Sequence, residues 1–111
     1  MDVKALLEQW EKAGHTRLTA TEYPVRLPVH DAARIAALAQ MYNLDLETVI
    51  TDLLAAALTE VEASFPYVQG SRVIAEDDHG DPIYEDIGPT PRYLDLVKEH
   101  AARLEQDIDE E

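Results

Sequence analysis

The chain contains no cysteine and no long hydrophobic run. Without cysteine it has neither disulfide bonds nor thiolate ligands for a metal. It also lacks a stretch of about 18 consecutive apolar residues, so the sequence predicts no transmembrane helix. The N-terminus does not show the basic-then-apolar pattern of a secretory signal. We therefore expect a cytoplasmic protein with no membrane partner.

Positive charge is scarce, because nine Lys and Arg residues stand against 23 Asp and Glu residues, which gives a formal net charge of -14. The imbalance is greatest in residues 66–111, which hold 13 acidic and four basic residues, whereas residues 16–65 hold seven and three. A field of this sign repels phosphate backbones and anionic lipid surfaces. The composition argues against general nucleic-acid affinity and leaves room for a local basic contact.

Motifs for catalysis and cofactor binding are missing as well. The chain has no Gly-x-Ser-x-Gly elbow, no glycine-rich phosphate loop and no cysteine nucleophile. Its densest group of potential metal ligands is EDDHGDPIYED, residues 76–86. If Gly80 were the glycine of an EF-hand loop, the first ligand position would fall on Ala75, which carries no ligand atom. We expect no enzymatic activity, no cofactor and no bound metal.

Residues 1–15 have the pattern of a short amphipathic helix. Asp2 is a suitable N-cap, and Gly14 is suited to end the helix. Four apolar residues follow helical spacing between these two positions, namely Val3, Leu6, Leu7 and Trp10. This apolar stripe needs a partner surface, which is either the rest of the domain or another protein.

The stretch YPVRLP, residues 23–28, alternates like a β-strand although it contains two prolines. Period-two geometry places Tyr23, Val25 and Leu27 on one face. Pro24 and Pro28 share the other parity, where a strand that is paired along one side only leaves its N–H groups unused. The sequence therefore predicts a strand in a two-stranded ribbon.

Two helix patterns follow, over residues 29–42 and 46–63. Asn43 is a plausible left-handed residue at the end of the first, and Asp45 is a good N-cap for the second. The second pattern has an apolar stripe too wide to be covered by one strand and one helix. A unit of about 40 residues also commonly needs oligomerisation to be stable. We therefore predict a dimerisation core in residues 16–65.

Residues 66–111 form an acidic extension. Residues 72–76 and 82–86 predict two short strands around a turn that contains Gly80. Thr90 and Pro91 then predict the N-cap and the first residue of a final helix. The predicted fold class is mostly α with short β, comprising an N-terminal helix, a two-helix dimer core and a hairpin with a C-terminal helix.

The segment VRLPVHDAARIAALAQMYNLDLETVITDLLAAALTEVE, residues 25–62, resembles the ribbon-helix-helix family of Arc and methionine-repressor type. The resemblance implies that strands from two chains pair antiparallel, that the helices interlock, and that the ribbon enters the major groove of double-stranded DNA. On this basis the dimer core is predicted to comprise Tyr23, Val25, Leu27, Ile35, Leu38, Val49, Ile50, Leu53, Leu54 and Leu58.

The resemblance also implies which residues face DNA. They are the outward strand residues Glu22, Pro24 and Arg26, of which only Arg26 has the guanidinium that binds guanine bidentately. Arg17 and Arg34 are candidates for phosphate contacts. Asp45 and the following Glu47 lie where the family binds phosphate at a helix N-terminus, so the sequence gives a mixed prediction for DNA binding.

Two functions are therefore compatible with the sequence. One is a homodimeric transcriptional regulator that reads DNA through the paired strands, and the other is an acidic dimeric scaffold that binds a basic protein and not DNA. The whole chain, including YVQGSRVIAEDDHGDPIYEDIG, also resembles a group of small bacterial proteins that carry a pilus-tip-component label. That label implies export and a pilin sandwich, whereas helical patterning covers two thirds of this chain.

Overall fold

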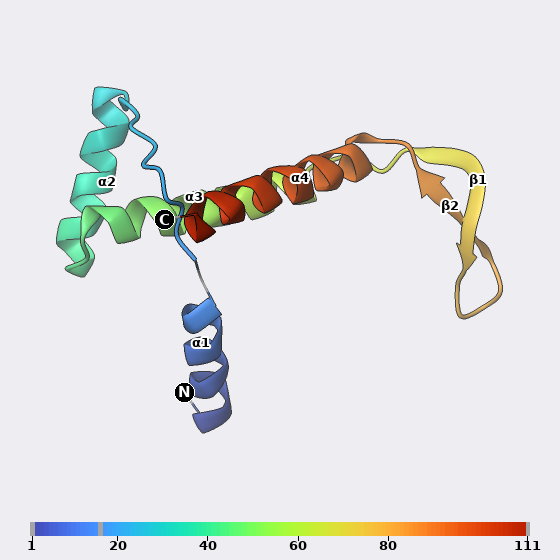
Figure 1. Ribbon diagram of the computed structural model, residues 1–111, viewed down its shortest axis with the longest axis horizontal. Helices are drawn as coiled ribbons and strands as arrows, with labels where there is room; N and C mark the ends of the chain where they lie inside the picture. The colour runs from blue at the N-terminus through green and yellow to red at the C-terminus, as the bar shows by residue number, and fades with distance from the viewer. Residues whose placement is uncertain (1, 16, 111) are drawn as a thin grey trace. The chain divides into compact units, whose positions relative to one another are not determined.

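A computed structural model describes residues 2–15 and 17–110 (Figure 1). Its elements in chain order are α1 (Val3–His15), α2 (Val29–Tyr42), α3 (Leu46–Ala63), β1 (Gln69–Glu76), β2 (Pro82–Asp86) and α4 (Pro89–Asp109). The chain divides into two units, of which one is Pro24–Lys98 and the other combines Met1–Tyr23 with Glu99–Glu111. The predicted class, mostly α with short β, is confirmed, and none of the described helices combines the length and apolar character needed to cross a bilayer.

The N-terminal helix α1 begins as its sequence predicts. The backbone N–H of Ala5 donates to Asp2 Oδ1 at 2.7 Å, and the N–H of Leu6 donates to the Asp2 carbonyl at 3.1 Å. Asp2 therefore caps the helix and satisfies donors that have no partner inside its first turn. The apolar side chains of Val3, Leu7 and Trp10 are all exposed.

Helices α2 and α3 have the predicted bounds because local signals set the turn between them. Asn43 adopts φ 53° and ψ 50°, the left-handed conformation that ends a helix, and the N–H of Leu44 donates to the Ala39 carbonyl at 2.9 Å. Asp45 then accepts a hydrogen bond from the Thr48 N–H at 2.8 Å and caps α3. Each helix has one buried residue, Ala39 in α2 and Val49 in α3, which are 8% and 6% exposed.

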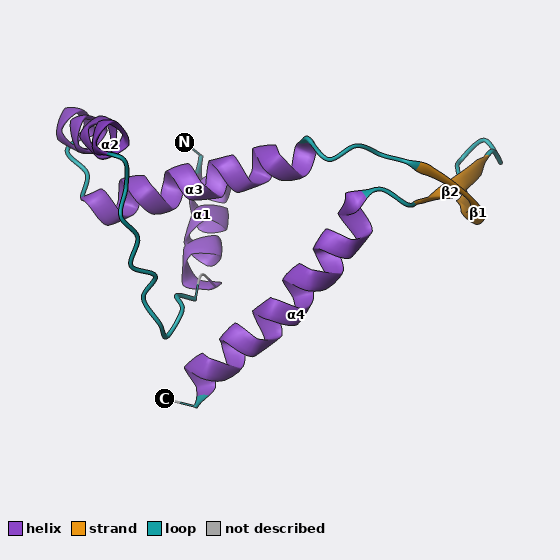
Figure 2. Cartoon of the chain, turned by 90° about the horizontal axis from the view of Figure 1, so that it is seen from above, coloured by secondary structure: helices purple, strands orange, loops and turns teal. Residues whose placement is uncertain are grey.

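Residues 22–28, which we call the ribbon segment, form no hydrogen-bonded strand in the single chain. They run as an irregular connection into α2 (Figure 2). The Pro28 carbonyl accepts from the Ala32 N–H at 3.0 Å and so opens α2, and the described strand pairing is confined to β1 and β2. A ribbon of the predicted kind takes its second strand from another chain, so the paired strand stays a prediction.

The acidic hairpin pairs β1 and β2 antiparallel, as the sequence predicts, and β2 has the predicted bounds. The expected start of β1 at Arg72 is wrong, because the strand begins at Gln69, opposite Asp86. Two register shifts interrupt the ladder between Gln69 and Ala75. Such irregularities break the period-two alternation from which strand limits are inferred. The sequence of residues 69–71, at the beginning of β1, therefore shows no strand pattern.

Helix α4 begins at Pro89, so the prediction of Thr90 as N-cap and Pro91 as first helical residue is wrong by two positions. Proline suits a first helical position because it has no N–H to satisfy there. The residue before it, Gly88, donates its N–H to Asp86 Oδ1 at 2.8 Å, and the same oxygen accepts the Val68 N–H at 3.0 Å. One carboxylate therefore fixes both the start of α4 and the segment that enters β1.

Candidate dimer face and nucleic-acid contact surface

Three of the predicted dimer-core residues on the helices lie around one groove. Ile35 and Leu38 of α2 and Leu53 of α3 line an open groove of about 250 Å3, together with Asp31 and Arg34 of α2. Apolar side chains from two helices thus form one surface, and exposure of such a surface to water is energetically unfavourable. The structure thus brings together three of the ten residues that we predicted for the dimer core.

The other predicted core residues divide into two classes. Val49 is buried and Ile50 is half-buried in the single chain, where both lie on the apolar face of α3. Leu54 and Leu58 on α3 are exposed, as are the three apolar residues of the ribbon segment, Tyr23, Val25 and Leu27. Val25 has 74% of its surface exposed, which is far from a core position. The single chain therefore does not fill the predicted core.

The candidate DNA-contact residues are distributed over the two units. Arg26 is exposed and takes part in none of the ion pairs found in residues 2–15 and 17–110. Pro24 and Arg26 belong to the unit Pro24–Lys98, whereas Glu22 and Arg17 belong to the unit made from the chain ends. Arg26 is therefore the cation most available to an anionic ligand on the ribbon segment.

The two arginines expected at phosphates already have carboxylate neighbours. Arg17 Nη2 lies 2.8 Å from Asp109 Oδ1, and Arg34 Nη1 lies 3.5 Å from Asp31 Oδ1 on the same helix. Both pairs are exposed, and such pairs contribute about 0 to 1 kcal/mol. A phosphate would compete with each carboxylate without a large penalty, although each aspartate reduces the local positive potential.

The N-terminus of α3 carries negative charge. Asp45 accepts hydrogen bonds from Thr48, and these hold the pKa of the Asp45 carboxyl below its ordinary value. The bond from the Thr48 side chain has the larger effect, and the bond from the Thr48 backbone N–H has the smaller one. The carboxylate is therefore ionised at neutral pH at the place where a phosphate would meet the free N–H groups of the helix. Glu47 adds a second acidic group in the same turn. This helix end is a poor anion site as it stands.

Sequence reasoning missed how the ends of α3 and α4 are joined. The ring of Tyr93 lies edge-on to Phe65 with 5.0 Å between centroids, and its hydroxyl bonds to Glu62. Tyr67 donates from its hydroxyl to the Tyr84 carbonyl at 3.0 Å. These contacts join residues 17 to 31 positions apart, and only the Asp-x-Gly-Pro sequence at residues 86–89 gave a local signal for such a junction.

Two other observations limit the chemistry of the chain. Among the described residues no group of three or more His, Asp or Glu side chains is arranged to hold a metal ion. The acidic turn uses its first carboxylate internally, because Asp77 Oδ1 accepts the N–H groups of both His79 and Asp81 at 2.9 Å.

Comparisons with protein-family models, with curated proteins and with solved structures find no match to this chain.

Proposed function

We propose that the chain is a homodimeric ribbon-helix-helix protein that binds double-stranded DNA in the major groove through two paired ribbon segments. The proposal rests on two features of the unit Pro24–Lys98, which are its small buried core and the unpaired segment at its beginning. Its helix pair has only Ala39 and Val49 buried among the described residues, while the segment before α2 has no strand partner. A second copy supplies both a strand and an apolar surface.

The burial that a second copy provides is large enough to matter. Six apolar side chains of the ribbon segment and α3 are between 42% and 74% exposed, namely Val25, Leu27, Leu53, Leu54, Leu58 and Val61. Covering the exposed half of six such side chains contributes about 5 to 9 kcal/mol per chain as an upper estimate. Backbone hydrogen bonds between the two ribbon segments add to this gain.

Arg26 is the proposed reader of DNA. In a strand with Val25 and Leu27 turned toward the helices, Arg26 faces outward from the ribbon, and the ribbon of a dimer presents two such guanidinium groups. A bidentate bond from one guanidinium to guanine O6 and N7 is worth about 1 to 3 kcal/mol of discrimination.

The test is a selection from a random duplex library at about 50 mM salt, where phosphate contacts are strongest. We expect enrichment of a two-fold symmetric site, with loss of the enriched base in Arg26→Ala. The matched control is Arg92→Ala, which removes the same charge from α4. Absence of enrichment at this salt concentration contradicts DNA binding.

A second function, an acidic dimeric scaffold for a basic protein partner, is favoured by the carboxylates of Asp45 and Glu47 at the start of α3 and by the net charge. Its test is binding of a polylysine peptide to the wild type and to a variant in which Asp77, Asp78 and Asp81 are replaced by asparagine. Binding that survives Arg26→Ala and is lost in the asparagine variant supports the scaffold.

A further inference from the structure

The hairpin of β1 and β2 carries an exposed apolar face. Alternate residues of a strand point to opposite sides of the sheet, so Ile83 and Ile87 lie on one side. Ile87 follows β2 directly and continues its ladder, because its N–H donates to the Val68 carbonyl at 2.8 Å. The register shift in β1 sets both Ile74 and Ala75 opposite Ile83. The three isoleucines are 58%, 41% and 60% exposed in chain order, and we call them the isoleucine face.

Two contacts agree with this assignment of side chains to one face. Arg72 Nε lies 3.1 Å from Glu85 Oε2, and Glu85 has the same parity on β2 as Ile83 and Ile87. A Cβ atom added to Gly70 would lie 2.9 Å from Ile87 Cγ2, so the lack of a side chain at residue 70 leaves room for Ile87. The middle of the face is therefore apolar, and the two charges within it are paired with each other.

Neither edge of the hairpin is suited to pair with a further strand. The Asp81 carbonyl accepts the Asp77 N–H, so the next residue, Pro82, faces the outer edge of β2, where it has no N–H to donate. Tyr84 has the same parity, and its carbonyl already accepts the Tyr67 hydroxyl at 3.0 Å. Two register shifts interrupt the row of donors and acceptors along β1. A partner is therefore expected on the face and not along an edge.

The surroundings of the isoleucine face are acidic at one end. Residues 67–88 hold six acidic residues and one basic residue, Arg72. By the alternation along each strand, Asp77 and Asp81 extend the face at the turn, and neither takes part in the ion pairs found in residues 2–15 and 17–110. At the other end Ile87 shares an open groove of about 520 Å3 with Arg92. Basic groups of a partner therefore fit at the turn end of the face.

We propose that the isoleucine face binds a basic amphipathic helix of another protein. The apolar stripe of such a helix covers the three isoleucines, and Lys or Arg side chains at one of its ends reach Asp77 and Asp81. The hairpin of a second copy fits poorly, because the same acidic residues would oppose each other across the contact. The proposal rests on the second proposed function, the acidic scaffold, and specifies its contact surface and the kind of partner.

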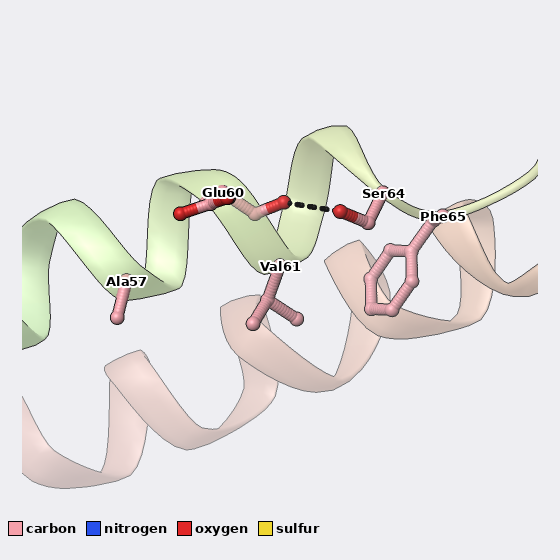
Figure 3. Close-up of a pocket in the computed structure, with 5 residues that line it drawn as sticks. All are labelled: Ala57, Glu60, Val61, Ser64 and Phe65. Atoms are coloured by element: carbon pink, nitrogen blue, oxygen red, sulfur yellow. Dashed lines mark hydrogen bonds between the residues drawn. The ribbon is translucent and has the colours of Figure 1, made fainter.

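A groove of about 450 Å3 at the end of α3 is the alternative place for such a helix. Its lining residues are Ala57, Glu60, Val61, Ser64 and Phe65 (Figure 3). Val61 is one of the side chains that the proposed dimer covers, and the Phe65 ring already contacts Tyr93 at 5.0 Å between centroids. This groove also offers a single carboxylate, from Glu60, to a basic partner. The isoleucine face has two, and its apolar residues have no other assigned contact.

The test uses the full-length chain and two short synthetic peptides with the same content of leucine and lysine. The leucines follow helical spacing in one peptide and alternate with lysine in the other, which favours a strand. Polylysine measures the attraction by charge alone. We expect the helical peptide to bind about tenfold more tightly than the alternating peptide or polylysine, as measured by fluorescence anisotropy.

Substitutions on opposite sides of β1 locate the binding site. Ile74→Thr and Ile83→Thr each keep a β-branched residue, so the strands keep their propensity while the apolar face is reduced. The matched control is Val73→Thr, because Val73 pairs with Tyr84 on the other side of the sheet and is 50% exposed. Each isoleucine variant should bind the helical peptide about fivefold more weakly, whereas Val73→Thr should stay within about twofold of the wild type. Circular dichroism checks that the variants are folded.

A second pair of variants tests the contribution of charge. Asp81→Asn removes an acid from the turn end of the isoleucine face and should weaken binding of the helical peptide about threefold at low salt. Glu76→Gln is the control, because Glu76 pairs with Pro82 on the opposite side of the sheet. Equal effects of the two substitutions contradict a basic end placed at Asp77 and Asp81.

Three further results overturn the proposal. Equal binding of the helical and alternating peptides excludes recognition of a helix, and equal weakening by Val73→Thr and Ile74→Thr excludes the isoleucine face. Reduced self-association of the isoleucine variants with unchanged peptide binding shows that a second copy covers the face. If polylysine binds as tightly as the helical peptide, the scaffold function stands and this inference fails. If none of these probes binds, the scaffold function fails as well.

Discussion

Tyr93 donates its hydroxyl proton to Glu62 Oε1 at 2.7 Å and thereby fastens the beginning of α4 to the last turn of α3. The hydrogen bond to Glu62, followed by desolvation and the negative charge of Glu62, raises the pKa of the Tyr93 phenol above its ordinary value. The neutral phenol is thus the form that the folded chain prefers. This contact gives the junction between α3 and α4 a signature that titration can detect.

The first prediction concerns the pH dependence of this contact. A group whose pKa is raised by folding adds stability that is fully present below its unfolded pKa, near 10.0 for tyrosine, and is lost as the pH rises through the folded pKa. The melting temperature of the wild type should exceed that of Tyr93→Phe at pH 8, and the difference should vanish above the folded pKa. A difference that is independent of pH would contradict the role given to the hydroxyl.

The second prediction uses Asp45. Its pKa is lowered by the Thr48 hydrogen bonds, so the stability that its charge provides is present above the ordinary pKa of 3.8 and is lost as the pH falls through the folded pKa. Asp45→Asn keeps an N-cap acceptor without the charge, whereas Asp45→Ala removes the cap. We expect the melting temperature to fall more in Asp45→Ala than in Asp45→Asn at pH 7.

Asp45→Asn also separates the two proposed functions. If the dimer binds DNA, loss of a negative charge at the start of α3 in each chain should raise affinity for the selected site several-fold at low salt, because anions are then less repelled. Asp52→Asn is the matched control, since it removes the same charge from the interior of α3. Equal effects of the two substitutions would indicate a general charge effect and no phosphate contact at this helix end.

The third prediction concerns the close approach of two connecting segments at Gly88. A Cβ atom added there would lie 2.5 Å from the Pro66 carbonyl oxygen and 3.0 Å from Asp86 Oδ1. Gly88→Ala therefore forces the backbone apart and should cost about 1 to 3 kcal/mol of unfolding free energy. Chemical denaturation followed by circular dichroism provides the measurement.

A glycine in open space provides the control for that substitution. Gly80 has φ +80° and no atom within 4 Å of an added Cβ. Gly80→Ala should cost about 1 kcal/mol through backbone strain alone, and Gly80→Asn should cost less because asparagine tolerates this conformation. If Gly88→Ala proved no more harmful than Gly80→Asn, the close approach would not be a constraint.

The features that the sequence predicted well depend on neighbouring residues. Asn43 and Asp45 end one helix and begin the next through bonds to residues within five positions, so the bounds of α2 and α3 follow from the local sequence. The start of α4 does not, because Asp86 fixes it together with Val68, which lies 18 residues away. The register shifts in β1 likewise depend on its pairing with β2.

The candidate site was predictable in part for a different reason. The helical spacing of Ile35, Leu38 and Leu53 marks them as one apolar face, and they do line one groove. What covers that groove is not encoded in any local pattern, because burial of a dimer face depends on a second chain. The direction of the Arg26 side chain likewise depends on a second chain, since it is fixed only when the ribbon segment pairs.

The fourth prediction tests the groove between α2 and α3 as a dimer face. Leu53 is 45% exposed in the single chain, so about half of the 2 to 5 kcal/mol cost of a buried Leu→Ala change should appear in association. Two chains lose this contact in each dimer, and the dissociation constant of Leu53→Ala should rise about 30-fold or more in sedimentation equilibrium. The control is Met41→Ala, whose side chain is 72% exposed on α2 and lies outside the groove. Its dissociation constant should stay within about threefold of the wild type, as expected for a surface substitution. A compact monomer at micromolar concentration in the wild type, or equal weakening by both substitutions, would contradict a dimer face at this groove.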